Sequence, residues 1–167
     1  MTTELPPGVA RFFDPAAIAA NRAGRLAPTQ AARLLRTVVL RVIGYVVSGS
    51  LAFMLYTIRA EATGTAGLVL GVVVLAVLAV VLLVFQVLPP LLDQVSGRAE
   101  AVSGTVRKES WISTGGLSRN RRYQIQVADQ AFRVGRGLFA AVSGDDETTA
   151  YFLPRTGELL TVEEPRP

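Results

Sequence analysis

Three arginines lie within four residues, directly before an alternating run that ends at Val134. Arg119, Arg121 and Arg122 are candidate contacts for a nucleic acid, a lipid headgroup or a protein partner. The alternative is a basic turn that meets only water. Nucleic-acid-binding domains are usually basic, whereas residues 93–167 carry ten basic and ten acidic side chains. We therefore expect no nucleic-acid partner. Lipid, protein and water all remain possible contacts of these arginines.

The residue types that carry most enzymatic chemistry are missing. The sequence has no cysteine and no histidine, which excludes disulfides, thiolate nucleophiles, imidazole acid–base catalysis, and zinc or haem sites with those ligands. The acidic run 144–147 lacks the spaced ligands of a calcium loop and predicts a solvated turn. No Gly-Lys-Ser/Thr pattern is present. We therefore predict that the protein is not an enzyme and binds no cofactor or metal.

Two apolar stretches of the sequence are each long enough to cross a bilayer. Residues 68–88 contain nine Val, seven Leu, one Phe and no charge. At roughly −0.3 to −0.6 kcal/mol for each of these residues, insertion is favoured by about 5–10 kcal/mol. Residues 37–58 contain one charge, Arg41, which is close enough to the end to reach the headgroups. We predict two spanning helices; the alternatives are a buried soluble helix for 68–88 and an interfacial helix for 37–58.

The charge distribution predicts the orientation of this helical hairpin. Residues 1–41 carry six arginines against two acidic residues, whereas the loop between the spans and the segment after them are both neutral. Because positive charge near membrane ends stays in the cytoplasm, we expect a multi-pass protein of the inner (plasma) membrane with both termini cytoplasmic. Four arginines of the first segment are candidate contacts for the anionic inner leaflet or a partner: Arg22, Arg25, Arg36 and Arg41.

Small residues recur every four positions in both predicted spans. Such spacing lets helix backbones approach closely. The contact lies either within the hairpin or with another subunit, and the pattern does not choose between them. The candidate packing residues are Gly44, Ser48 and Ala52 in the first span and Gly67 and Gly71 in the second.

The N-terminal segment, residues 1–36, is predicted to be helical and cytoplasmic. Asp14 is a suitable N-cap, Pro15 suits the first helical position and Gly24 suits a helix end, so residues 15–23 should form a short helix. A second helix should begin at Pro28 and continue into the first span. The apolar side chains of the short helix and its entry either lie on the membrane surface or dock on the C-terminal domain.

After the hairpin, assigned to residues 37–92, the sequence changes to a period of two. Pro89 and Pro90 predict the end of regular helix or a kink, and 91–97 a short connector. Residues 99–167 predict about five short strands and one small helix, including a hairpin with Asp129 and Gln130 in its turn. A curled sheet of the OB or SH3-like kind would bury the one apolar face. Its expected core aromatics are Trp111, Tyr123, Phe132, Phe139, Tyr151 and Phe152.

Two stretches carry a resemblance. The run RRYQIQVADQAFRVGRGLFAAVSGDDETTAYFLPRTGELLTVEE and the segment AANRAGRLAPTQAARL resemble uncharacterised bacterial membrane proteins with two transmembrane helices and a small C-terminal cytoplasmic β domain. The general plan is also similar to the NfeD-type proteins, which carry a membrane-anchored OB domain. The matching positions are mostly core and turn residues, so the resemblance implies a fold and no catalytic residues.

Taken together, these patterns favour a binding function. We expect a non-enzymatic accessory or assembly subunit, or a scaffold, that contacts other membrane-protein subunits or itself through its β domain. The alternative is a membrane-tethered ligand-sensing or regulatory module. An oligomeric channel and a single-stranded nucleic-acid binder are less favoured, the channel because Arg41 and Gln86 are the only strongly polar members of the spans.

Overall fold

The computed structural model of the 167-residue chain describes residues 6–60, 64–115, 118–144 and 146–164. The chain divides into two compact units. One joins Met1–Gln30 to Gly97–Pro167, and the other is Ala31–Ser96. Each unit is described by itself.

The helical unit consists of two long apolar helical runs. Helix α3 (Pro28–Ala60) begins at the predicted proline and continues without a break through the first apolar stretch. The second run consists of α4 (Gly64–Leu82), a π-helical segment η2 (Leu83–Val87) and α5 (Leu88–Ser96). Both runs are long and apolar enough to cross a membrane.

The expected connector at 91–97 is wrong, because α5 continues to Ser96. Pro89 and Pro90 are the second and third residues of α5 and lie inside a continuous helical run, which lacks the N–H donors of these two positions. The change of geometry precedes them. The N–H of Leu88 bonds to the carbonyl of Leu83, five residues back, so the helix widens to a π turn just before the prolines.

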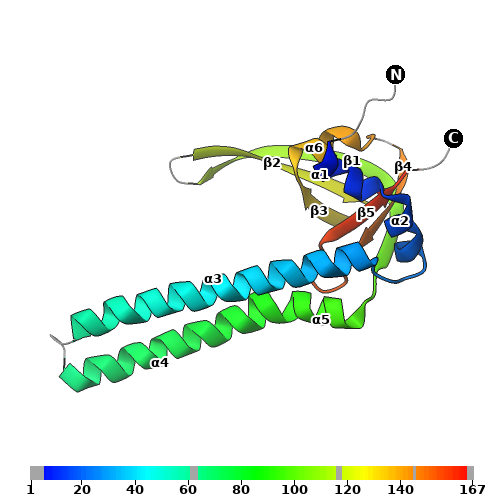
Figure 1. Cartoon of the computed structure of the whole chain (residues 1–167). Coiled ribbons are helices and arrows are strands. Elements are labelled where there is room, and N and C mark those ends of the chain that lie inside the picture. The colour runs from blue at the N-terminus through cyan, green and yellow to red at the C-terminus, as the bar shows by residue number, and fades with distance from the viewer. Residues whose placement is uncertain (1–5, 61–63, 116–117, 145, 165–167) are drawn as a thin grey trace. The chain divides into compact units, whose positions relative to one another are not determined.

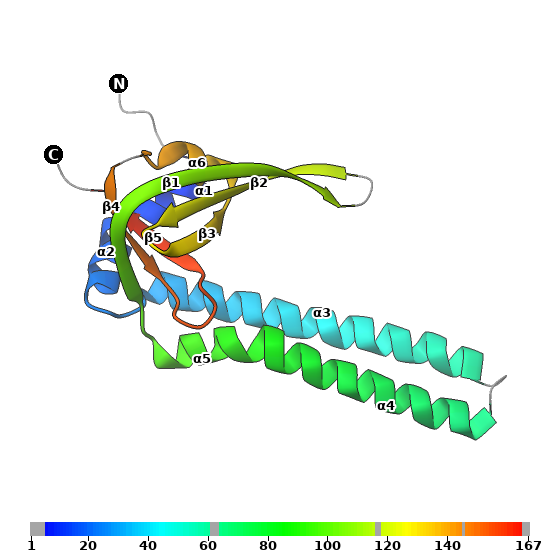
Figure 2. The ribbon, with the colours of Figure 1, turned by 180° about the vertical axis from the view of Figure 1, so that it is seen from behind.

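The other unit contains an open, five-stranded antiparallel sheet. Its strands are β1 (Glu100–Gly115), β2 (Ser118–Val127), β3 (Gln130–Val134), β4 (Glu147–Phe152) and β5 (Leu159–Glu163), in the order β3-β2-β1-β4-β5. The predicted small helix is α6 (Arg136–Ala141), between β3 and β4. Strand β1 pairs with β4 through residues 100–105 and with β2 through 106–115. Figure 2 shows β1 curving as it passes from one partner to the other.

The sheet closes over one apolar core. Ile125, Val162 and Ala150 are fully buried in it, and the Phe132 and Phe152 rings pack at an interplanar angle of 52° with centroids 5.5 Å apart. Tyr151 is also buried, whereas Tyr123 and Phe139 are half-buried and their tilted rings contact each other. The prediction that Trp111 lies in the core is wrong. Its side chain is 38% exposed, because it lies on the face of β1 opposite to Val106 and beyond the end of β3.

The turn between β2 and β3 lies one residue earlier than predicted. Val127 pairs with Gln130, so Ala128 and Asp129 form the two-residue turn. Ala128 has a φ of 49°, as a tight hairpin turn requires, and its carbonyl accepts a hydrogen bond from Gln126 Nε2 at 3.1 Å. A Cβ on Gly104 would lie only 3.0 Å from the Ala128 backbone nitrogen, so the absence of a side chain at Gly104 leaves space for the turn.

The N-terminal segment belongs to the same compact unit as the sheet. It forms α1 (Pro7–Ala10), a 3₁₀ turn η1 (Arg11–Phe13) and α2 (Pro15–Arg22). The Asp14 side chain accepts from the N–H of Ala16 at 3.1 Å, and Gly24 ends the helix with a φ of 71°, as predicted. Figure 1 shows α2 beside β5 and α1 beside α6.

The apolar side chains of this segment face the core of the β unit. Val9 is buried in the core, and Phe12 and Phe13 pack against it. Of the two sequence-based alternatives, docking on the C-terminal domain is therefore the one observed. The segment then returns to the start of the sheet: the N–H of Leu26 bonds to the carbonyl of Gly97 at 2.9 Å, and that of Ala99 bonds to Gly24 at 3.2 Å. The β unit is thus built from chain on both sides of the helical hairpin.

Candidate functional site

The candidate surface is a two-stranded ribbon formed by the far ends of β1 and β2. Strand β3 pairs with β2 only over residues 123–127, so the pairs from Trp111–Arg122 onward extend past the sheet. Figure 2 shows this ribbon projecting beyond β3. Trp111 and its neighbour Ile112 are both exposed there. Exposed aromatic and arginine side chains side by side are typical of interface cores.

The strand register divides the predicted arginines between the two faces of this ribbon. Residues directly opposite in an antiparallel pair lie on the same face. Arg122 is the partner of Trp111 on the outer face, and Arg121 is the partner of Ile112 on the face that continues the core. Arg119 is in β2, but its side chain lies outside the described part of the chain. Arg121 and Arg122 therefore leave β2 on opposite faces of the ribbon.

Arg121 and Arg122 instead meet two further arginines around an open cleft of about 450 Å³. The cleft lies where β3 ends at Val134, the partner of Tyr123, while β2 continues without β3 beside it. No acidic residue lines it, and none of its four guanidinium groups forms an ion pair with a described carboxylate. We call this feature the arginine cleft; it is lined by Arg121, Arg122, Tyr123, Arg133, Val134, Gly135 and Arg136.

Arg133 and Arg136 are the members that the sequence interpretation missed. Their signal was the register of the β2–β3 hairpin. When Tyr123 pairs with Val134, residues just before Tyr123 and just after Val134 must lie beside each other at the same end of the hairpin. Counting outward from the turn would therefore have brought Arg136 to Arg121 and Arg122.

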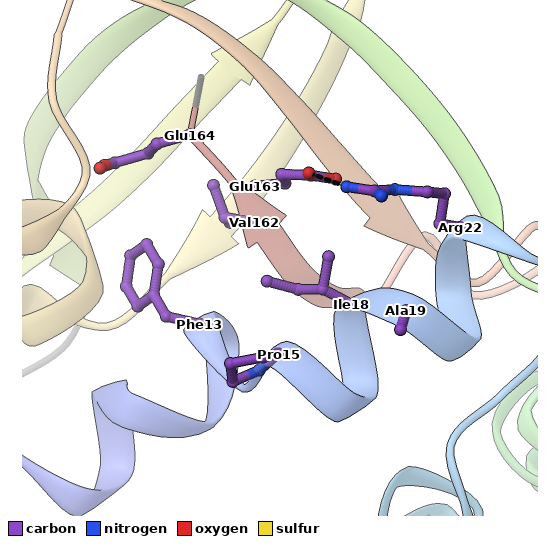
Figure 3. Close-up of a pocket in the computed structure, with 8 residues that line it drawn as sticks. All are labelled: Phe13, Pro15, Ile18, Ala19, Arg22, Val162, Glu163 and Glu164. Carbon is purple, nitrogen blue, oxygen red and sulfur yellow. Dashed lines mark hydrogen bonds and ion pairs between the residues drawn. The ribbon is translucent and has the colours of Figure 1, made fainter. Parts of the chain in front are cut away.

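Arg22 lies in a different place, against β5. Its guanidinium forms an ion pair with the Glu163 carboxylate, and the hydroxyl of buried Tyr151 donates to the other oxygen of that carboxylate at 2.9 Å. Figure 3 shows Arg22 reaching Glu163 across a small cleft of about 210 Å³ between α2 and β5, with Phe13 and Ile18 pointing toward the strand. Arg22 therefore fastens the N-terminal segment to the sheet.

Two pKa values reflect this network. The hydroxyl of Tyr151, followed by Glu163, raises the pKa of Arg22 above its ordinary value. Burial, followed by the hydrogen bond to Glu163, raises the pKa of Tyr151. Both groups are therefore held in their protonated forms, in which Tyr151 donates and Arg22 is a cation.

Asn21, the residue before Arg22, forms a buried hydrogen bond. Asn21 Nδ2 donates to Thr161 Oγ1 at 2.7 Å, and both side chains are almost completely buried. The Asn21 carbonyl oxygen is buried without a partner among the described atoms. This bond joins α2 to the middle of β5, so the docked segment is held by specific polar contacts as well as by apolar packing.

Arg41 connects the two long helical runs. Pro90 has no N–H, so the Gln86 carbonyl, four residues earlier, lacks its usual helical donor. Arg41 Nη1 donates to that carbonyl at 3.3 Å, and the Tyr45 hydroxyl donates to the Gln86 side chain. The two polar residues singled out in the apolar stretches therefore meet. Of the remaining predicted arginines, Arg25 pairs through its backbone with Arg98, and Arg36 is an exposed residue of α3.

The small residues of the apolar stretches fall in several environments. Gly71 lies against the ring of Tyr56 across the hairpin, where a Cβ would overlap the ring. Ser48 and Ala52 line an apolar groove of about 730 Å³ between α3 and the second helical run. Gly44 has open space around its Cα, and the surroundings of Gly67 lie outside the described part of the structure.

Comparison with known proteins gives no relative for this chain. No family model, no curated protein and no solved structure matches it.

Proposed function

We propose that the chain is a non-enzymatic protein of the inner membrane, with both termini in the cytoplasm, and that its β unit acts as a scaffold or accessory subunit of a membrane complex. The helical hairpin serves as the anchor. The β unit supplies the binding surface, with the ribbon of β1 and β2 as its most prominent part.

One observation carries the membrane part of this proposal. The two helical runs leave their apolar side chains uncovered: Val46, Leu70 and Phe85 are 62%, 66% and 74% exposed. The β unit, in contrast, buries most of its described apolar side chains in one core, with Trp111 and Ile112 as its large exposed ones. Apolar surface on this scale needs a cover, and lipid supplies it along two helices of spanning length. The positive charge of residues 1–41 supports the cytoplasmic placement of the β unit.

The fold of the β unit supports binding as its activity. We propose that its curled sheet belongs to the OB or SH3-like class, which the five strands, the shared β1 and the helix between β3 and β4 support. In OB folds the loop between the first two strands contributes to binding, and here that position holds the ribbon with Trp111 and Ile112. An experimental structure that shows another sheet order would contradict this assignment.

Two experiments test the function. A reporter that is active only in the cytoplasm, fused after Pro167, should be active, and activity of a periplasmic reporter at the same position would refute the topology. The full chain, purified in mild detergent and analysed by native mass spectrometry, should appear as an oligomer or in a stoichiometric complex. The I112S variant should lose that partner, whereas a Q130S control at the exposed first residue of β3 should keep it. A strictly monomeric wild-type particle would contradict the scaffold role.

A further inference from the structure

We propose that the arginine cleft is a binding site for a phosphate group, carried either by a small phosphorylated anion or by the headgroup of an anionic lipid. The lipid source rests on the proposed membrane anchoring. The small-anion source does not, because the cleft lies wholly within the β unit.

Uncompensated charge is the first argument. Arg121, Arg122, Arg133 and Arg136 surround one concavity, yet residues 93–167 as a whole have no net charge. Acidic side chains are therefore available in the unit, but none lines the cleft. Like charges that face one another repel, and an anion between them relieves that repulsion. Arg22, in the same unit, forms an ion pair with the Glu163 carboxylate, whereas no such partner is found for the cleft arginines among the described carboxylates.

The placement of the arginines is the second argument. Arg121 and Arg122 are neighbours on β2 and therefore point to opposite faces, while Arg133 and Arg136 come from the end of β3 and the start of α6. The four arginines that line the cleft thus come from three elements, β2, β3 and α6. A guanidinium group matches two phosphate oxygens at once, so an oxyanion with several oxygens can bind more than one of them.

The remaining lining of the cleft suits the rest of a ligand. Tyr123 and Val134 are half-buried there and present apolar surface beside the cations. A volume of about 450 Å³ lies within the range of about 300–1,000 Å³ that is common for small-molecule sites. Beyond Val134 the edge of β2 has no β3 residue beside it, which leaves backbone polar groups available at the cleft wall.

The chain contains its own reporter for this site. Trp111 is the single tryptophan, and it is the register partner of Arg122 on the same face of the ribbon. It is partly exposed, so an anion bound at Arg122 changes the polarity and charge around its indole ring. Tryptophan fluorescence therefore reports occupancy without an added label.

The test uses the full chain in nanodiscs. In zwitterionic phosphatidylcholine nanodiscs, inorganic phosphate and, in parallel, sodium chloride of equal ionic strength are titrated while Trp111 fluorescence is recorded. In a second arm, the phosphatidylcholine is partly replaced by phosphatidylglycerol. We expect saturable change with phosphate and none with chloride if a small anion is the source. A change with phosphatidylglycerol alone identifies the lipid headgroup, and either result supports the site.

Matched variants separate the site from general charge. R133Q/R136Q should weaken the response at least about tenfold, since each lost charge-assisted hydrogen bond is worth roughly that factor or more. R98Q/R107Q removes the same amount of charge outside the cleft and should change the fluorescence response less than about twofold. R133K/R136K, which keeps the charge but not the paired hydrogen bonds, should fall between them. Each variant's thermal midpoint confirms folding; exposed R121Q/R122Q provides a second cleft variant if the first fails to fold.

Three outcomes would overturn the proposal. One is the absence of any response to phosphate and to phosphatidylglycerol. Another is an equal loss in R133Q/R136Q and R98Q/R107Q, which would reduce the effect to net charge. The third is a response only to a single-stranded oligonucleotide, included as a further titrant. Failure of the protein to enter nanodiscs at all would instead contradict the proposed anchoring, and the phosphate titration would then be run on the full chain in detergent.

Discussion

The hydrogen bond between Asn21 and Thr161 predicts a measurable coupling between the N-terminal segment and β5. The two side chains are 2% and 0% exposed, and their donor and acceptor atoms lie 2.7 Å apart. N21A leaves the Thr161 hydroxyl buried without a partner, which costs about 1–3 kcal/mol. T161V leaves a whole buried carboxamide unpaired, because the Asn21 oxygen already lacks a partner, so its cost should lie at the upper end of that range.

The double variant N21A/T161V removes both polar groups at once. It should be less destabilised than the sum of the single variants, with a coupling free energy of about 0.5–3 kcal/mol. Amide hydrogen exchange on the full chain in detergent measures the opening free energies of α2 and β5 separately. Both elements should lose protection together in each single variant. The exposed Thr29 offers a matched control, T29V, whose effect should stay within about 0.5 kcal/mol.

Two results would refute this reasoning. Additive single effects would show that the bond does not couple the two residues. Loss of protection in β5 alone, with α2 unchanged, would show that α2 is not docked on the sheet in solution, which would favour its alternative position on the membrane surface.

Three further predictions follow from contacts of single side chains. The folded-state pKa of Tyr151 is raised above 10.0, so the stability that its hydroxyl contributes is present below pH 10 and is lost as pH rises through the folded pKa. The thermal midpoint of Y151F should therefore fall less steeply than that of the wild type between about pH 9 and 11. An equally steep fall in both proteins would contradict the burial of this hydroxyl. R41M orphans the Gln86 carbonyl and should lower the stability of the helical hairpin to detergent denaturation by about 1 kcal/mol; P90A, which restores the missing N–H, should reduce that loss, and an equal loss in both backgrounds would count against the assigned role of Arg41. Trp111 fluorescence should be quenched by iodide in neutral nanodiscs, and resistance to quenching would return this residue to the core.

Much of the fold follows from local patterns in the sequence. The N-cap Asp14 and the helix start at Pro28 are in the predicted places, because capping and proline geometry act within a few residues. The prediction that Trp111 lies in the core disagrees with the period of two along β1. Counting by two from Val106 puts position 111 on the opposite face, and this period outweighs the general preference of a large aromatic side chain for a core.

The rest depended on contacts between distant parts of the chain. An apolar face on the segment around Phe12, Phe13 and Ile18 fits a membrane surface and a protein core equally well, and only the tertiary structure distinguishes them. The arginine cleft combines residues more than ten positions apart whose approach depends on hairpin register, and the turn was predicted one residue late. The two prolines predict either a helix end or a kink, and the π turn that precedes them leaves no clear signal in the sequence.

The hydrogen bond between Leu26 and Gly97 has a consequence for the order in which the protein matures. During synthesis the docking segment is made first and its sheet last, with the whole helical hairpin between them. Residues 6–30 therefore cannot dock on the sheet until β5 has left the ribosome, and Val9 and Phe13 stay uncovered until then. The same adjacency marks where the hairpin can be removed. A chain in which a short glycine linker joins Gln30 directly to Gly97 should retain a complete β unit in water, whereas one that begins at Ala99 would lack part of its core.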